Sequence, residues 1–163
     1  MKEEIAVLAG GCFWGMEYLF SKLEGVISCE AGYCGGNKEN PSYQDVKTGE
    51  TGHAESVKII FDCEKITYGA ILDYFFKIHD PTTVNRQMGD VGTQYRSEIF
   101  YLNESQRKEA LEAVKRAQEN WDDKIVTAIT PFKIFWKAEE YHQKYLNKNP
   151  GGYICHFERK FQK

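Results

Sequence analysis

The stretch Gly10-Gly11-Cys12-Phe13-Trp14-Gly15 is the point around which we expect this chain to fold. It follows an apolar run, Ile5–Ala9, that is typical of a buried strand. After it, apolar residues recur at helical spacing, at Phe13, Met16, Phe20 and Leu23. The sequence therefore predicts a strand that turns through two glycines into a helix over Cys12–Leu23.

Cys12 is then expected at the first residue of the helix, which has chemical consequences. The first N–H groups of a helix lack intrahelical partners and carry a partial positive charge. A thiol at that place typically has its pKa lowered from about 8.5 to about 3.5–7.5, which favours the nucleophilic thiolate. The alternative is an inert buried cysteine, because free cysteine is among the most buried residue types.

Composition limits the classes of protein to which the chain can belong. It has 163 residues, a net charge of −3 and 42% hydrophobic residues, which suits one globular domain over 1–163, with a flexible C-terminal tail from about residue 147. The absence of a basic stripe argues against binding to nucleic acid or to a membrane surface. The charged N-terminus does not resemble a signal peptide, so a cytoplasmic location is expected.

The five cysteines do not suggest a structural role as a set. Their number is odd and no Cys-x-x-Cys pair occurs, so neither a disulfide framework nor a zinc site is expected.

Strands and helices alternate along the rest of the chain, separated by two long polar loops. The patterns predict strands at 26–33, 56–62, 97–102 and 126–130, helices at 68–79, from Asn103 or Ser105 to about 121, and at 138–146, and loops at 37–54 (with a helical turn near 43–46) and 81–96. Thr67 is the expected N-cap of the second helix. The order predicts an α+β fold, a two-layer α/β sandwich around a mixed sheet.

The two loops carry polar residues whose roles stay open when each is considered alone. Glu55 is either a surface carboxylate or a partly buried acid with a raised pKa that donates a proton. His53 is either a base for Cys12 or a hydrogen-bonded loop residue. Tyr43 and Tyr95 are two of ten tyrosines, and Asp90 is a typical turn residue.

Taken together, five motifs resemble the peptide methionine sulfoxide reductase A (MsrA) family. They are Gly-Cys-Phe-Trp-Gly at 11–15, Gly-His-Ala-Glu at 52–55, His-Asp-Pro-Thr-Thr at 79–83, Asp-Val-Gly-Thr-Gln-Tyr-Arg-Ser at 90–97 and Glu-Tyr-His-Gln at 140–143. The resemblance spans nearly the whole chain and implies a ferredoxin-like core.

The resemblance also implies a role for individual residues. Cys12 matches the nucleophile, and Glu55 matches the acid that protonates the sulfoxide oxygen. Tyr43 and Tyr95 match phenols that help to hold this oxygen, and Asp90 matches a carboxylate that orders the site. The pair Phe13 and Trp14 matches the apolar wall that receives the substrate's methyl group.

By the same resemblance, Cys12 ends the reduction of a methionine S-sulfoxide, free or in a protein, as a sulfenic acid. Cys155 is the expected resolving thiol, with Cys34 or Cys29 as alternatives, and no second tail cysteine follows it. Recycling by thioredoxin is expected, with glutaredoxin or glutathione as other reductants. The resemblance implies no cofactor and no metal, and a monomer is expected.

Three other functions fit single features of the sequence. A cysteine hydrolase or acyltransferase would use Cys12 with His53 or His142 as its base. A noncatalytic module would recognise oxidised methionine through Phe13 and Trp14, and a related thiol enzyme would reduce peroxide instead of a sulfoxide. Counting free thiols after reaction, and comparing the rates with peroxide and with sulfoxide, separates these functions from methionine sulfoxide reduction.

Overall fold

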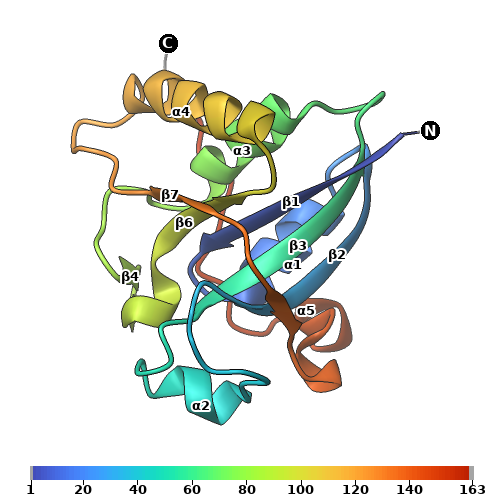
Figure 1. Ribbon diagram of the computed structural model, residues 1–163, viewed down its shortest axis with the longest axis vertical. Helices are drawn as coiled ribbons and strands as arrows, with labels where there is room; N and C mark the ends of the chain where they lie inside the picture. Colours follow the sequence, from blue (N-terminus) through green and yellow to red (C-terminus); the bar gives the residue numbers. More distant parts are fainter. Residues whose placement is uncertain (1, 162–163) are drawn as a thin grey trace.

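A computed structural model describes residues 2–161, and a mixed six-stranded sheet forms its centre (Figure 1). The strands lie in the order β7-β6-β1-β3-β2-β8, antiparallel except for the parallel pair β6 and β7. Their bounds are β1 (Glu3–Gly10), β2 (Val26–Cys34), β3 (Ala54–Asp62), β6 (Ser97–Tyr101), β7 (Ala128–Pro131) and β8 (Phe135–Lys137). The expected α+β class with a mixed sheet is confirmed.

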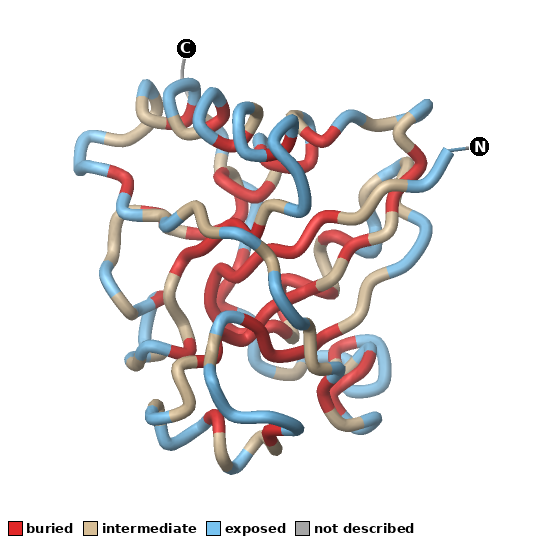
Figure 2. The backbone as a smooth tube through the Cα atoms, viewed as in Figure 1, coloured by how far each residue is buried: buried red, intermediate tan, exposed pale blue. Residues whose placement is uncertain are grey.

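Strand β1 lies in the middle of the sheet and is buried on both faces, which explains why Ile5–Ala9 is apolar throughout. Ala6 and Leu8 belong to the main core, whereas Val7 and Ala9 belong to a smaller cluster on the other face. Side chains alternate between the faces of a strand, so a strand covered on both sides needs no polar positions. Figure 2 shows this buried centre in red.

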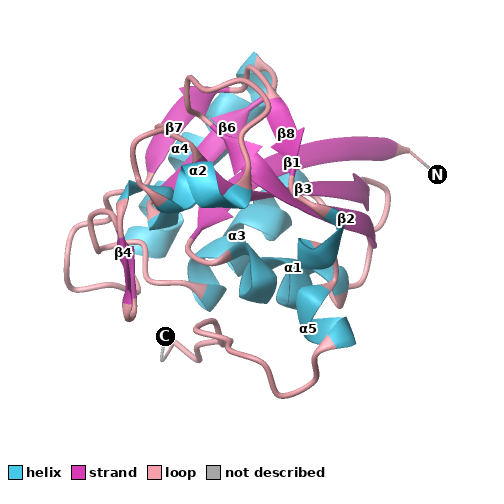
Figure 3. Cartoon of the chain, turned by 90° about the horizontal axis from the view of Figure 1, so that it is seen from below, coloured by secondary structure: helices cyan, strands magenta, loops and turns pink. Residues whose placement is uncertain are grey.

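Three longer helices form the second layer. They are α1 (Phe13–Ser21), α3 (Tyr68–Ile78) and α4 (Glu104–Gln118), and α1 and α3 lie on one face of the sheet (Figure 3). The main core between this layer and the sheet includes Phe20, Phe75 and Ile59, which are fully buried. Two short helices, α2 (Tyr43–Lys47) and α5 (Tyr145–Lys148), complete the five found in residues 2–161.

The expected caps and loop helix are present. The Thr67 hydroxyl accepts a hydrogen bond from the Ala70 N–H at 3.0 Å, which confirms it as the cap of α3. At α4 the cap is Asn103, whose side chain accepts from the Gln106 N–H at 2.9 Å, and not Ser105. The helical turn predicted near 43–46 is α2, which Ser42 and Asp45 close with a capping box.

The helix predicted over 138–146 is wrong. A 3-10 turn, Glu140–His142, and the separate helix α5 occupy this region. The Gln143 side chain is bonded to both backbone groups of Ala31 on β2, at 2.9 Å each, and Lys144 takes a positive φ of 54°. A local pattern of apolar residues cannot predict this tie to a distant strand.

One further segment has more regular structure than expected. The loop at 81–96 contains a small hairpin of β4 (Arg86–Gln87) and β5 (Asp90–Val91), followed by the 3-10 helix η1 (Thr93–Tyr95). After α5, residues 149–161 run without regular structure from α5 past α1 to α3. The last two residues of the predicted tail, 162–163, lie outside the described residues.

No helix within residues 2–161 is both long enough and apolar enough to cross a lipid bilayer.

Candidate active site

Cys12 immediately precedes α1, whereas the sequence predicted it to be the first residue of this helix. It is the N-cap residue, with φ −57° and ψ 125°, and the helix begins at Phe13. Gly11, before it, has a φ of 99°, and a Cβ there would lie 2.6 Å from the Gln87 Cγ. Only glycine adopts this turn without strain, so Gly11 fixes the direction in which Cys12 leaves the strand.

Glu55 of β3 reaches the same helix start. Its Oε1 accepts a hydrogen bond from the Phe13 N–H at 3.2 Å, and its side chain is only 2% exposed. Burial raises the pKa of Glu55 to about 8, with a smaller contribution from the negative charge of Asp90. At neutral pH Glu55 is therefore mostly a neutral acid that can donate a proton.

The pKa of Cys12 is raised, which contradicts the expectation of a lowered pKa. Burial is the main cause, because the thiol is covered, and the nearby Glu55 is the second. The Trp14 N–H does lower the pKa, as expected for a helix start, but by less than these two effects raise it. Without substrate the thiol therefore keeps its proton.

Tyr43, Tyr95 and Asp90 come from three separate elements and meet at Cys12 and Glu55. Burial raises the pKa of Tyr43 to about 12 and also raises that of Tyr95, and the charges of Glu55, Cys12 and Asp90 act on both phenols. Both phenols therefore remain protonated hydrogen-bond donors. Every residue predicted for the reacting centre is thus brought to one place.

Phe13 and Trp14 occupy different environments beside this centre. Phe13 is 1% exposed and packs against Tyr33 and His142, with ring centroids 5.7 and 5.0 Å apart. Trp14 is half-buried, stacks on Tyr145 at 3.7 Å and donates its indole N–H to the His142 Nδ1 at 2.9 Å. His142 thus orients Trp14.

Cys155 lies in the same place, carried there by the C-terminal segment. It is 8% exposed, the backbone N–H of Cys12 lowers the pKa of its thiol, and its sulfur is 3.8 Å from the Asp90 Oδ2. Tyr153 donates to the same Asp90 oxygen at 3.3 Å. Cys12 and Cys155 are both free thiols.

The other two candidate thiols lie elsewhere. Cys34 belongs to the small cluster on the face of the sheet opposite α1, so the sheet separates it from Cys12. Cys29 packs at the edge of the main core, where burial and Glu17 raise its pKa. Neither residue contributes to the electrostatic surroundings of Cys12, whereas Cys155 does.

Both ring nitrogens of His53 make hydrogen bonds to nearby backbone groups. Its Nδ1 accepts from the Gly36 N–H at 3.0 Å, and its Nε2 is 2.7 Å from the Lys38 carbonyl oxygen. With both ring nitrogens occupied, His53 has none left to act as a base for Cys12. Its structural interpretation is confirmed, and the hydrolase hypothesis loses one of its two candidate bases.

Sequence reasoning missed three residues around the centre. Glu139 accepts from the Tyr43 N–H and from the Tyr33 hydroxyl, both at 2.8 Å, and so positions α2. Tyr153 and His156 both flank Cys155. In sequence, Tyr153 and His156 were marked only by their closeness to Cys155, and Glu139 only by its position next to the motif at 140–143.

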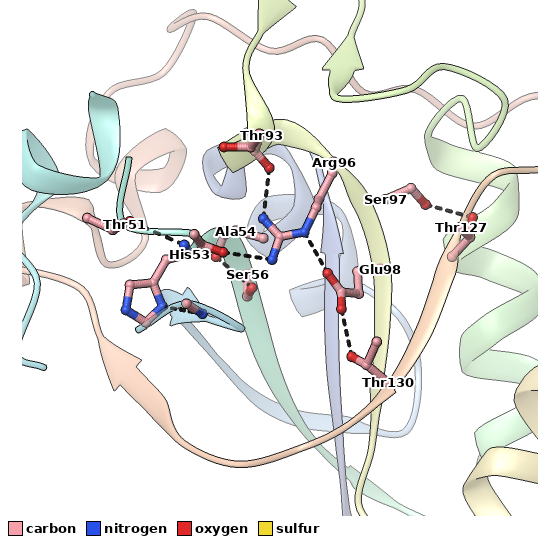
Figure 4. A network of polar contacts seen from close by, with 12 residues as sticks. Thr51, His53, Ala54, Ser56, Thr93, Arg96, Ser97, Glu98, Thr127 and Thr130 are labelled. Atoms are coloured by element: carbon pink, nitrogen blue, oxygen red, sulfur yellow. Dashed lines mark hydrogen bonds and ion pairs between the residues drawn. The ribbon is translucent and has the colours of Figure 1, made fainter. Parts of the chain in front are cut away.

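Arg96 joins the loops that carry the site (Figure 4). Its guanidinium donates to Glu98 at 2.6 Å, to the Thr93 carbonyl at 2.9 Å and to the Gly52 carbonyl at 2.9 Å. Thr130 of β7 donates to the other oxygen of Glu98 at 2.6 Å. This network fixes the segment before Glu55 against the turn that holds Tyr95.

We expect Arg96→Met to lower the free energy of unfolding by about 2 kcal/mol, because the buried Glu98 carboxylate loses its cationic partner. Urea denaturation measures this change. Arg107→Met is the matched control: its ion pair with Glu104 is exposed, so a change below about 0.5 kcal/mol is expected. Equal effects of the two substitutions would contradict the structural role of Arg96.

A cavity of about 440 Å³ does not coincide with this centre. It lies beside Cys34 on the opposite face of the sheet, where Glu98, Phe100 and Trp136 contribute to its lining. Chemistry, not cavity size, therefore locates the candidate active site, because the acid, the phenols and two thiols converge only around Cys12.

Comparison with known proteins decides the family. Residues 4–163 match the family described as peptide methionine sulfoxide reductase. The chain belongs to the MsrA family. An MsrA from the archaeon Methanothermobacter thermautotrophicus is 54% identical over 149 residues, covering 90% of this chain and 88% of the relative.

Solved structures of MsrA relatives have the same fold. The yeast protein Mxr1 in its reduced form superposes with a TM-score of 0.93 at 41% identity, over 98% of this chain and 93% of that one. Mxr1 in complex with Trx2 gives a TM-score of 0.68 at 29% identity, over 98% and 91% of the two chains.

Proposed function

We propose that this MsrA family member reduces methionine S-sulfoxide, free or in proteins, to methionine, and that a sulfenic acid forms on Cys12. One observation carries the proposal: the buried Glu55 carboxyl, with a pKa near 8, is bonded to the Phe13 N–H beside the Cys12 thiol. A nucleophilic sulfur and a neutral acid are the two groups that sulfoxide reduction needs. The preference for the S-epimer follows from the family resemblance.

In the proposed reaction the Cys12 sulfur attacks the sulfoxide sulfur while Glu55 protonates the sulfoxide oxygen. Tyr43 and Tyr95 donate hydrogen bonds to this oxygen as negative charge develops on it. The oxygen is transferred to the Cys12 sulfur, methionine leaves, and the thiol proton replaces the one that Glu55 gave. Because the resting thiol is protonated, the nucleophile forms only when substrate is bound.

The remaining site residues position the substrate and the acid, and they take no part in making or breaking bonds. Phe13 and Trp14 would hold the substrate's methyl group, since aromatic faces suit a methyl group next to a polarisable sulfur. Asp90 accepts a hydrogen bond from Tyr153 and adds negative charge near Glu55, which helps to keep this acid protonated.

Cys155 is the thiol that we propose to resolve the sulfenic acid. Its position supports this choice over Cys34 and Cys29: its sulfur lies 3.8 Å from the Asp90 Oδ2, and it acts electrostatically on Cys12, as neither alternative thiol does. A Cys12–Cys155 disulfide would then be reduced by thioredoxin. Support for thioredoxin comes from the yeast relative Mxr1, which has been solved in complex with Trx2.

Two further parts of the proposal concern setting and fold. Five free cysteines suit a reducing compartment such as the cytoplasm. The four central strands, in the order β6-β1-β3-β2 and all antiparallel, with α1 and α3 on one face, support a ferredoxin-like core.

The test is to add one equivalent of methionine sulfoxide to the fully reduced protein and to count free thiols. We expect methionine to be released and the five thiols to fall to three, with a Cys12–Cys155 disulfide in the peptide map. Cys155→Ser should release methionine equally well but leave a trappable sulfenic acid and three other free thiols. A disulfide through Cys34 or Cys29 in the native chain would contradict the assignment of Cys155.

A further inference from the structure

His156 is a buried histidine whose two ring nitrogens have different roles. Its Nε2 is 2.6 Å from the Gly10 carbonyl oxygen, and the side chain is only 4% exposed. A carbonyl oxygen only accepts hydrogen bonds, so Nε2 carries the hydrogen. The other nitrogen, Nδ1, is therefore an unprotonated acceptor in the neutral ring.

This free acceptor faces the Cys155 thiol. Nδ1 is 3.6 Å from the Cys155 sulfur, and the Asp90 Oδ2 is a second acceptor, at 3.8 Å. The same Asp90 oxygen already accepts from Tyr153. The imidazole is thus the nearer acceptor, and it has no competing donor.

Glycines of the opening motif form the space that holds this ring. A Cβ on Gly15 would lie 2.3 Å from the His156 Nδ1, and one on Gly11 would lie 3.3 Å from its Nε2. Gly15 is in α1, where glycine costs about 1 kcal/mol relative to alanine. Room for an imidazole at the start of α1 gives this glycine a structural reason.

We propose that His156 is the general base of the resolving step and takes the Cys155 thiol proton onto Nδ1 as Cys155 attacks Cys12. This inference rests on the proposed function, because it needs the Cys12 sulfenic acid as its reaction partner. The bond between the two sulfurs forms and the S–O bond of Cys12 breaks. The departing hydroxide takes up one proton and leaves as water, which balances the proton lost by the thiol. Cys155 is oxidised and Cys12 is reduced, so no further oxidant is needed.

The surroundings of His156 keep Nδ1 unprotonated in the resting state but make it a weak base for the Cys155 thiol, whose pKa burial raises to about 11. The proton therefore moves only as Cys155 attacks, because the sulfur becomes more acidic while its new S–S bond forms. Burial, with a smaller contribution from the Arg159 cation, lowers the pKa of His156 to about 4, so Nδ1 is free of a proton at neutral pH. His79, the residue that follows α3, is also near and is neutral because burial lowers its pKa to about 3. Once the thiol proton has moved, the imidazolium lies beside the Cys155 thiolate, and this anion stabilises it.

The test separates the two chemical steps in one turnover with methionine sulfoxide. Methionine release reports the first step, and quenched thiol counting reports formation of the Cys12–Cys155 disulfide. In His156→Gln the amide N–H can still donate to the Gly10 carbonyl, but no group replaces Nδ1. We expect unchanged methionine release and disulfide formation slowed by about 10²-fold at pH 7. Its rate should then rise about tenfold per pH unit as hydroxide replaces the base.

Two other variants show whether His156 acts as a base or only holds the C-terminal segment in place through its bond to Gly10. His156→Asn loses the bond to Gly10, whereas Gly15→Ala keeps the histidine but displaces its ring. If His156 is the base, disulfide formation is slow in all three variants. Normal disulfide formation and an unchanged pH profile in His156→Gln, with slowing only in His156→Asn, would overturn the proposal. If the native chain releases no methionine, the proposed function fails instead, and the two failures remain distinguishable.

Discussion

Glu55→Gln is expected to slow methionine release in a single turnover by about 10²–10⁴-fold and to stabilise the folded protein at the same time. The glutamine amide retains the shape of the side chain but cannot protonate the sulfoxide oxygen. Hydroxide or oxide is a poor leaving group, so the first step loses its acid. Rapid-quench measurement of methionine release tests the kinetic half of this expectation.

The stability half follows from the raised pKa of Glu55. Its pKa rises from 4.5 in the unfolded chain to about 8 in the folded one, so between these values the folded state holds a proton that the unfolded state releases. The free energy of unfolding therefore falls as pH rises through this window. Above pH 8 the buried carboxylate costs on the order of 5 kcal/mol, and Glu55→Gln should recover much of this in urea denaturation at pH 9.

Glu17→Gln is the matched control for both halves. Glu17 is also 2% exposed, accepts a backbone hydrogen bond from Lys144 at 2.7 Å and has its pKa raised to about 6, mainly by burial. It lies on α1 away from the reacting atoms, so we expect a smaller gain in stability and a methionine release rate within about twofold of the native rate. A native rate in Glu55→Gln would remove Glu55 from its role as the acid.

Cys12→Ser is expected to abolish methionine sulfoxide reduction, with a loss on the order of 10⁴-fold or more, even with excess dithiothreitol. Serine preserves the size and the N-cap position, but its oxygen cannot take over the sulfoxide oxygen as a stable sulfenic acid does. Methionine release in a single turnover is the measurement, because it needs neither the resolving thiol nor a reductase.

The control for this substitution is Cys63→Ser, at a half-buried cysteine distant from the site. It should release methionine at the native rate and show that loss of a thiol as such does not matter. Substantial reduction by Cys12→Ser would show that the chemistry lies elsewhere in the chain and would end the proposed function. Hydrolysis of an activated ester by the native protein, with no change in thiol count, would favour a hydrolase instead.

Local patterns predicted most of the sheet and the three longer helices, because these elements depend on periodic burial. The failure at 138–146 has a definite cause in Gln143, whose bonds to Ala31 span 112 residues of sequence. Strand β8 was missed for a similar reason: Phe135 and Trp136 are extended only because the edge of β2 pairs with them. Neither partner is visible in a local window of sequence.

For the site, residue identities could be predicted but their electrostatics could not. The helix start at Cys12 predicts a lowered pKa, and the Trp14 N–H has this effect. The burial that outweighs it arises from groups brought together by the fold, including Glu55 and the tail at Cys155. Spacing in sequence carries no information on that burial, nor on the contact between His156 and Gly10.

The segment that carries Cys155 is attached on both sides. Before it, Leu146 of α5 is buried, and after it Tyr74 donates to Glu158 at 2.8 Å and the Arg159 N–H donates to the Lys77 carbonyl at 3.1 Å. Attachment at two ends gives the second thiol a high effective concentration at the first. In the proposed cycle, the sulfenic acid on Cys12 would be captured within the chain before peroxide could drive it to the irreversible sulfinic acid. The geometry of the tail would thus protect the enzyme from the oxidants whose damage it repairs.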